Sequence, residues 1–202
     1  ILLYLKSLNI FKSNLSVSIM TDPKGKTGLT NLGNTCFLNS CMQVLSNTPE
    51  LNVIFKSKLH MLDDIDDNND KLITREWVQL KDLMWSKNCT ISPGRFVKII
   101  QHIAGIKGKE LFTGFAQNDL PEFLLFIMDC FNMALKTKVH VNISGIEKNK
   151  TDELATKCYK MVKEMYEREY SPILDLFYGI SVSVITYLNE HICSSKPELF
   201  MT

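Results

Sequence analysis

The chain has 202 residues, 45% of them hydrophobic and 22% charged, which is ordinary for a globular protein. That length permits one or two domains and the burial of one sizeable core. The formal net charge of +1 gives no reason to expect nucleic acid or an anionic membrane surface as a partner, and the scattered positions of the six cysteines argue against a disulfide framework.

We expect residues 1–26 to be a disordered leader and residues 27–202 to form the folded domain. The apolar run from Ile1 to Leu5 is too short to span a membrane, and Lys6 interrupts it. No small-residue cleavage site follows it, as one would in a signal peptide. In this interpretation Met20 is the favoured translation start.

The most informative segment runs Gly-Leu-Thr-Asn-Leu-Gly-Asn-Thr-Cys-Phe-Leu-Asn over residues 28–39. Its cysteine, Cys36, follows a loop rich in glycine and asparagine. The apolar spacing after it predicts a helix over residues 36–47, with Thr35 or Asn34 as the cap.

A cysteine in the first turn of a helix lies beside unpaired backbone N–H groups and the positive end of the helix dipole. Both stabilise the thiolate, so we expect Cys36 to be reactive. Asn31 adds a side-chain amide that can donate to a developing oxyanion. The alternative is that Cys36 is a buried, inert hydrophobic residue.

The middle of the chain predicts two amphipathic helices. Residues 73–86 place their apolar side chains at helical spacing, with Trp77 and Trp85 expected in the core. A second helix is predicted to begin at Pro93, which suits a first helical position, and to end at Gly105.

Within residues 111–136, the apolar spacing from Leu120 to Ala134 predicts a third, largely buried helix, at whose start Asp119 and Glu122 are spaced as a capping box. Residues 152–169 predict a further amphipathic helix. The alternation of residue types after Gly179 predicts a strand. The chain is therefore expected to be mostly helical, with β-structure near its end.

The segment around Cys36 resembles the cysteine box of the ubiquitin-specific proteases, which are papain-like deubiquitinating enzymes. The match continues through Ser40, Leu45, Pro49 and Leu51. A second signature of that family is matched by Gln117, Asp119, Glu122, Phe123 and Leu124. Residues 173–179 are similar to the family's segment before its first fingers strand.

The resemblance implies an α+β, papain-like fold, of which this chain holds the mostly helical thumb and the first strands of the fingers and palm. It implies that Cys36 is the nucleophile and that Asn31 contributes to the oxyanion hole. It also implies that Asp119 and Glu122 hold the extended C-terminal tail of ubiquitin, because carboxylates pair well with the arginines of that tail. Pro121 replaces the residue that the family usually has between them, so any contact made by the usual side chain is expected to be lost.

The reaction of this family also needs a histidine that exchanges protons with the sulfur, and a polar residue that orients it. The chain contains His60, His102, His140 and His191, none of which lies in a segment like the family's histidine box. We therefore expect the catalytic histidine and its aspartate or asparagine partner to lie beyond Thr202. No cofactor is expected, and no metal, because the Cys-x-x-Cys pairs that hold zinc in many relatives are absent.

The predicted function is thiol-dependent hydrolysis of the bond after the C-terminal glycine of ubiquitin, with ubiquitin and ubiquitinated proteins as partners. The alternatives are a catalytically incomplete ubiquitin-binding module and a protease for another ubiquitin-like modifier. The sequence of residues 116–123 resembles homologues from large DNA viruses. This resemblance predicts that the protein is located in the cytoplasm of a host cell. We also expect residues 1–202 alone to be poorly stable and inactive, because a thumb without its palm leaves apolar surface uncovered.

Overall fold

The computed structural model of the chain describes residues 25–62, 68–186 and 192–201. Nearly all of the predicted leader and His191 lie outside these ranges. Among the described residues, no helix is both long enough and apolar enough to cross a membrane.

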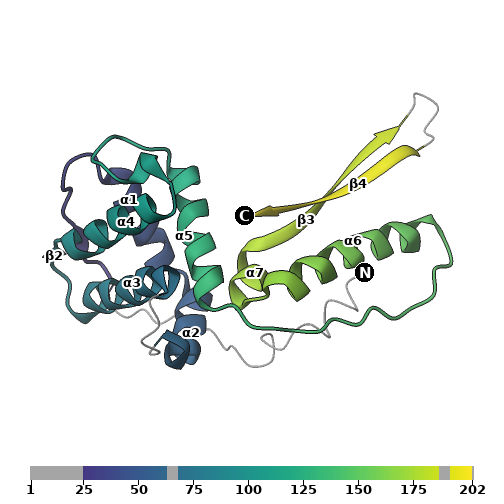
Figure 1. The fold of residues 1–202 in the computed structure, drawn as a ribbon, viewed down its shortest axis with the longest axis horizontal. Helices are drawn as coiled ribbons and strands as arrows, with labels where there is room; N and C mark the ends of the chain where they lie inside the picture. The colour runs from purple at the N-terminus through teal and green to yellow at the C-terminus, as the bar shows by residue number, and fades with distance from the viewer. Residues whose placement is uncertain (1–24, 63–67, 187–191, 202) are drawn as a thin grey trace. The chain divides into compact units, whose positions relative to one another are not determined.

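The chain is mostly helical, with two short two-stranded sheets, so the α+β class predicted from the sequence is confirmed (Figure 1). The elements in chain order are β1 (Gly28–Leu29), α1 (Cys36–Ser46), α2 (Pro49–Lys58), α3 (Asn69–Ser86), β2 (Thr90–Ile91), α4 (Gly94–Ile106), α5 (Leu120–Ala134), α6 (Lys150–Glu169), α7 (Pro172–Phe177), β3 (Tyr178–Thr186) and β4 (Ile192–Met201). Two short 3-10 turns are η1 (Leu59–Leu62) and η2 (Glu110–Phe112).

Helix α4 does not end where the sequence predicted. It passes through Gly105 to Ile106, and the residue that closes its last turn is Gly108, at a φ of +67°. That left-handed conformation favours glycine, and it lets the Lys109 N–H donate back to the Ala104 carbonyl at 2.8 Å. The stop signal is therefore Gly108, and Gly105 is an ordinary helical residue.

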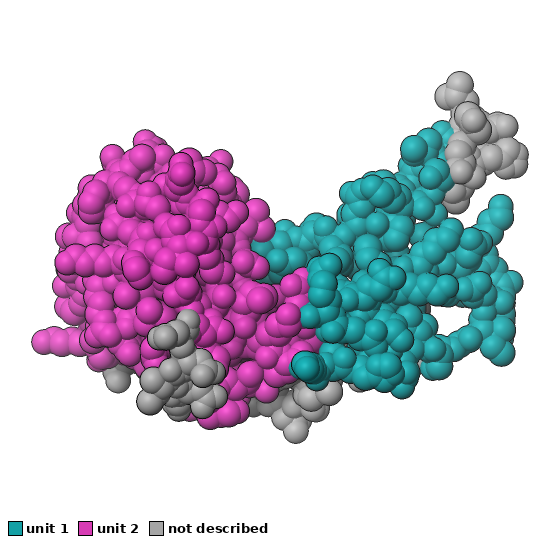
Figure 2. Space-filling view, in the orientation of Figure 1, with its two compact units in different colours: residues 1–21, 138–168, 177–202 teal, residues 22–137, 169–176 magenta. Residues whose placement is uncertain are grey.

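The described residues form two compact units (Figure 2). The first, here called the helical unit, contains residues 25–62, 68–137 and 169–176, with α1 to α5 and most of α7. The second, the hairpin unit, contains residues 138–168, 177–186 and 192–201, with α6 and the β3–β4 hairpin.

The helical unit contains the hydrophobic core. Helix α3 packs against α4 and α5, and α1 packs against α2 and α5. The largest fully buried side chains are Trp77, Phe55, Phe123, Phe131, Leu38, Met42, Leu51, Ile73, Met84, Ile103, Ile127 and Met128. Trp77 is thus a core residue, as predicted, whereas Trp85, which was also expected in the core, is only half-buried.

Aromatic contacts connect the helices across this core. The Phe131 ring meets Phe55 edge-on, with centroids 5.0 Å apart, and lies stacked 6.2 Å from Trp77. These contacts link α5 to α2 and α3, so α5 is fixed through its buried face. A buried hydrogen bond of 2.6 Å from the Ser171 hydroxyl to Asn132 attaches residues 169–176 to the same helix.

The hairpin unit has little buried apolar surface in its described part. Strands β3 and β4 pair antiparallel from Tyr178 with Met201, and most of their described side chains are exposed, Ile185 at 64% among them. A single two-stranded hairpin is marginal in water without a packing partner. This agrees with the expected low stability of residues 1–202 alone, which stays a prediction.

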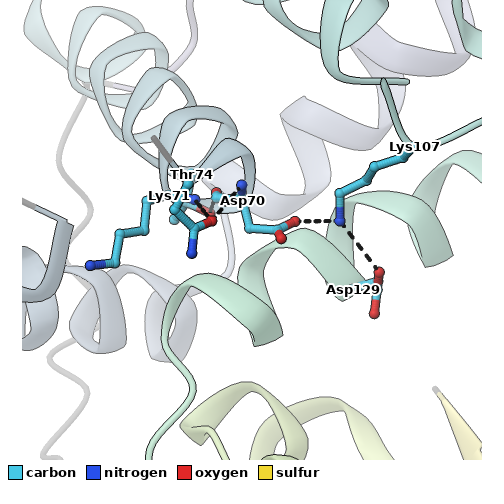
Figure 3. Close-up of polar contacts among 6 residues, drawn as sticks. Asp70, Lys71, Thr74, Lys107 and Asp129 are labelled. Carbon is cyan, nitrogen blue, oxygen red and sulfur yellow. Dashed lines mark hydrogen bonds and ion pairs between the residues drawn. The ribbon is translucent and has the colours of Figure 1, made fainter. Parts of the chain in front are cut away.

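An ion pair joins α3 to the end of α4 (Figure 3). The Lys107 ammonium lies 2.6 Å from Asp70 Oδ1, at the start of α3, and 4.0 Å from Asp129 Oδ2 on α5. Burial lowers the pKa of Lys107, but the hydrogen bond to Asp70 and the nearby negative charges outweigh it and raise the pKa above its usual value. The charged form of Lys107 is therefore favoured by the fold.

Replacing Lys107 with methionine is expected to lower the free energy of unfolding by about 1.5–3 kcal/mol, because Asp70, with 15% of its side chain exposed, loses its cation. Since the folded pKa is raised, this contribution is complete below the unfolded value of 10.5 and is lost as the pH rises through the folded value. Urea denaturation of the two proteins at neutral and at high pH measures it. Lys98→Met, an exposed position on α4, is the control. Equal losses in both variants, or a Lys107 effect that does not change with pH, would contradict this assignment.

Candidate active site

The candidate site is built on a loop, residues 31–35, that hydrogen-bonds to the Asn31 side chain. Asn31 Oδ1 accepts from the Gly33 N–H, the Thr35 N–H and the Thr35 hydroxyl, each at 3.1 Å. The Thr35 hydroxyl also accepts from the Leu32 N–H at 3.0 Å. Because the oxygen of the amide is turned into the loop, its NH2 group makes no hydrogen bond to any described residue, and Asn31 is exposed.

The turn of this loop depends on two residues with positive φ. Gly33 has a φ of +100°, and the space around it is open, so backbone conformation rather than crowding favours glycine there. Asn34 has a φ of +54°, which asparagine tolerates, and its NH2 group donates to the Phe115 carbonyl at 3.1 Å. The loop is thereby attached to the segment that leads into α5.

Cys36 is the first residue of α1, and its thiol is free and exposed. The predicted side-chain cap was wrong: Thr35 occupies the cap position, but its hydroxyl bonds within the loop and Asn34 reaches Phe115 instead. The N–H groups of residues 36–38 consequently find no acceptor in the described part of the chain. The sulfur lies at a helix end that presents unpaired donors.

The other described cysteines differ from Cys36. Cys41 and Cys130 are buried in the core, where burial raises the pKa of Cys41 to about 12 and that of Cys130 further above its usual range. Cys41 was expected to be a core residue, and this is confirmed. Cys89 is exposed and belongs to the loop before β2. Exposure and position together single out Cys36 from the buried thiols.

Asp119 and Glu122 lie at the start of α5 and are both exposed. The capping box predicted for them was wrong, because the Asp119 carboxylate accepts no hydrogen bond from the helix. In the described part of the chain neither carboxylate has a hydrogen bond or ion pair. Both are available to a cationic partner.

The start of α1 and the start of α5 are neighbours. The rings of Phe37 and Phe123 meet edge-on with centroids 5.1 Å apart, and each directly follows one of the candidate residues, Cys36 and Glu122. A cavity of about 20 Å³, room for one water molecule, lies between the cysteine loop and the segment before α5. The fold thus brings the two predicted signatures together, although no direct contact joins the carboxylates to Cys36.

No described histidine is hydrogen-bonded to Cys36. His60 and His102 are exposed, and His140 lies in the hairpin unit, with its Nδ1 2.9 Å from Glu167 Oε1. Among the described side chains, no three from the metal-binding residue types converge on a common point.

Two site features were not predicted from the sequence. One is the parallel pairing of β1 with β2, with Gly28 opposite Thr90 and Leu29 opposite Ile91. The other is the contact of the α1 side chains Asn39 and Gln43 with the carbonyl groups of residues 27–30. The available signal was two amides spaced four residues apart, which places them on one face of the predicted helix.

Known proteins support the family assignment. A family model described as ubiquitin carboxyl-terminal hydrolase matches residues 27–193. The chain is 35% identical over 185 residues to human "Ubiquitin carboxyl-terminal hydrolase 2", with 88% of this chain and 29% of that protein covered. It is 32% identical over 158 residues to "Ubiquitin carboxyl-terminal hydrolase Usp2" of Drosophila melanogaster, with 77% and 16% covered.

A more distant relative is "Ubiquitin carboxyl-terminal hydrolase 15" of Xenopus tropicalis, 29% identical over 169 residues, with 80% of this chain and 16% of that protein covered. The chain thus spans less than a third of the length of these relatives. The match covers both the cysteine loop and the start of α5. The chain belongs to the ubiquitin carboxyl-terminal hydrolase family, as its cysteine box indicated.

Proposed function

We propose that the protein is a thiol-dependent deubiquitinase that hydrolyses the bond after the C-terminal glycine of ubiquitin. The observation that carries this proposal is the exposed Cys36 at the start of α1, preceded by a loop in which the Asn31 oxygen is fixed and its NH2 group has no hydrogen bond to a described residue. The names of the relatives agree with this reaction. Ubiquitin and ubiquitinated proteins are the proposed partners, in the cytoplasm.

In this mechanism the Cys36 thiolate attacks the carbonyl carbon of the terminal glycine and forms a carbon–sulfur bond. The carbonyl oxygen becomes an oxyanion, which accepts hydrogen bonds from the Asn31 NH2 group and the Cys36 backbone N–H. Collapse of this intermediate expels the protonated amine and leaves a thioester, which water hydrolyses to release ubiquitin and the thiol. These proton transfers need a histidine, and no described histidine is hydrogen-bonded to Cys36.

The acidic pair suits the substrate in this proposal. The tail of ubiquitin carries arginines, and Asp119 and Glu122 are exposed carboxylates without partners among the described residues. A charge-assisted hydrogen bond to a guanidinium is about twice as strong as a neutral one. The two carboxylates are therefore proposed to hold the tail so that its last carbonyl reaches Cys36.

Cys36→Ala in the full-length protein is expected to reduce turnover of a ubiquitin–fluorophore substrate by at least about 10⁴-fold, because no other group replaces the nucleophile. Cys89→Ala removes an exposed thiol outside the cysteine loop and is the control, expected to leave turnover unchanged. Release of the fluorophore measures both. Retained turnover in Cys36→Ala would contradict the proposal, and a wild-type protein that binds ubiquitin without turnover would favour the binding-module alternative.

Asp119→Asn and Glu122→Gln are each expected to raise KM for the ubiquitin substrate about 10-fold, with kcat nearly unchanged, because they remove a charge-assisted hydrogen bond to the tail. Steady-state kinetics at several salt concentrations measure the effect, which should weaken as salt screens the wild-type interaction. Glu110→Gln, an exposed carboxylate in η2, is the matched control. The same KM in all of these proteins would show that the acidic pair does not bind the tail.

A further inference from the structure

Residues 27–30, which lead into the cysteine loop, make hydrogen bonds on two sides. On one side, the Gly28 N–H donates to the Cys89 carbonyl at 2.8 Å and the Thr30 N–H donates to the Ile91 carbonyl at 2.9 Å. In an extended segment, successive backbone groups point in opposite directions. The carbonyl groups of Thr27 and Leu29 therefore point away from β2.

Helix α1 supplies the donors on the other side. The Gln43 NH2 group donates to the Thr27 carbonyl at 2.7 Å. The Asn39 NH2 group lies 3.3 Å from the Leu29 carbonyl and 3.2 Å from the Thr30 carbonyl, so it is shared between them. The side-chain amides of α1 thus donate the hydrogen bonds that the backbone of a further strand would otherwise supply.

The surroundings of Asn39 fix the orientation of its side-chain amide. Its Oδ1 is buried and has no hydrogen-bond partner among the described residues, so the amide is oriented by what its NH2 group holds. Leaving a buried acceptor unpaired is costly. Because the fold keeps this costly arrangement, we infer that it needs the contact between the Asn39 NH2 group and the carbonyl groups of Leu29 and Thr30.

We propose that Asn39, supported by Gln43, is a positioning residue: it fixes the backbone directly before Asn31 and so sets the distance from the Asn31 NH2 group to the Cys36 sulfur. This inference rests on the proposed function. Asn39 lies three residues after Cys36 on the same helix, and it holds the carbonyl of Thr30, the residue before Asn31. The nucleophile and the oxyanion donor are therefore connected through one rigid helix and one hydrogen-bonded amide.

The test is Asn39→Asp, which keeps the shape of the side chain but places a carboxylate oxygen against the Leu29 and Thr30 carbonyls. The matched control is Asn52→Asp on α2. Asn52 also has a buried Oδ1 without a described partner, and its NH2 group also donates to a carbonyl, that of Ser46, at 2.8 Å. Asn52 makes no contact with the cysteine loop, so it reports the purely structural cost of this substitution.

In the full-length protein, Asn39→Asp is expected to lower kcat for a ubiquitin–fluorophore substrate about 10- to 100-fold with KM within about twofold, since a misplaced oxyanion donor acts only in the transition state. Asn52→Asp is expected to match the wild type. Equal kcat losses in the two variants would overturn the inference.

Two reagents separate positioning from a general disturbance of the thiol. Ubiquitin aldehyde adds to the sulfur and turns its carbonyl oxygen into a group that needs the oxyanion donors, so Asn39→Asp should bind it about 10- to 100-fold more weakly. Iodoacetamide reacts when the sulfur attacks its CH2 carbon and iodide leaves, which forms no oxyanion, so the alkylation rate at Cys36 should stay within about twofold of wild type. An alkylation rate that falls as far as turnover would show that Asn39 supports the thiol itself and would overturn the inference.

Hydrogen exchange of the Gly28 and Thr30 amides tests the contact without any turnover. Asn39→Asp should speed their exchange about 10-fold, whereas Asn52→Asp should not. Unchanged exchange in Asn39→Asp would overturn the inference even in an active enzyme. A wild-type protein that neither hydrolyses the substrate nor binds the aldehyde would instead refute the proposed function, while the exchange rates would still decide whether Asn39 holds this segment.

Discussion

The three hydrogen bonds that residues 33 and 35 donate to the Asn31 side-chain oxygen organise the candidate site. They close the loop on itself, use the hydroxyl that would otherwise cap α1, and leave the Asn31 NH2 group without a hydrogen bond to any described residue. The start of α1 therefore keeps its unpaired N–H groups next to Cys36. One local set of hydrogen bonds thus yields both a free amide donor and an uncapped helix end, which are two kinds of donor that can stabilise an oxyanion.

This loop relies on a core that lies within the helical unit. Phe37 packs on Phe123, which joins the start of α1 to the start of α5, and the buried face of α5 packs on Trp77 and Phe55 through Phe131. The site is therefore supported by rigid helices rather than by loops alone. The hairpin unit contributes none of the candidate residues, and its exposed strands make it dependent on further packing for stability.

The sequence predicted the parts that depend on local pattern. Helix α1 and its exposed cysteine, the buried Trp77 and the strand after Gly179 all follow from apolar spacing and turn residues. The missed parts depend on contacts distant in sequence. The β1–β2 pairing joins segments about sixty residues apart through two residues each. The Thr35 hydroxyl bonds to the Asn31 amide instead of capping α1. The contact between the start of α1 and the start of α5 comes from the structure, because no local pattern places α5 beside α1.

Asn31 and the Cys36 backbone are proposed to form an oxyanion site for a carbonyl attacked by Cys36. A crystal structure of the full-length protein with ubiquitin aldehyde would show whether they do. We expect a bond from the Cys36 sulfur to the aldehyde carbon, with the oxygen about 2.7–3.1 Å from the Asn31 NH2 group and the Cys36 N–H. An adduct on another cysteine, or an oxygen directed away from Asn31, would contradict it.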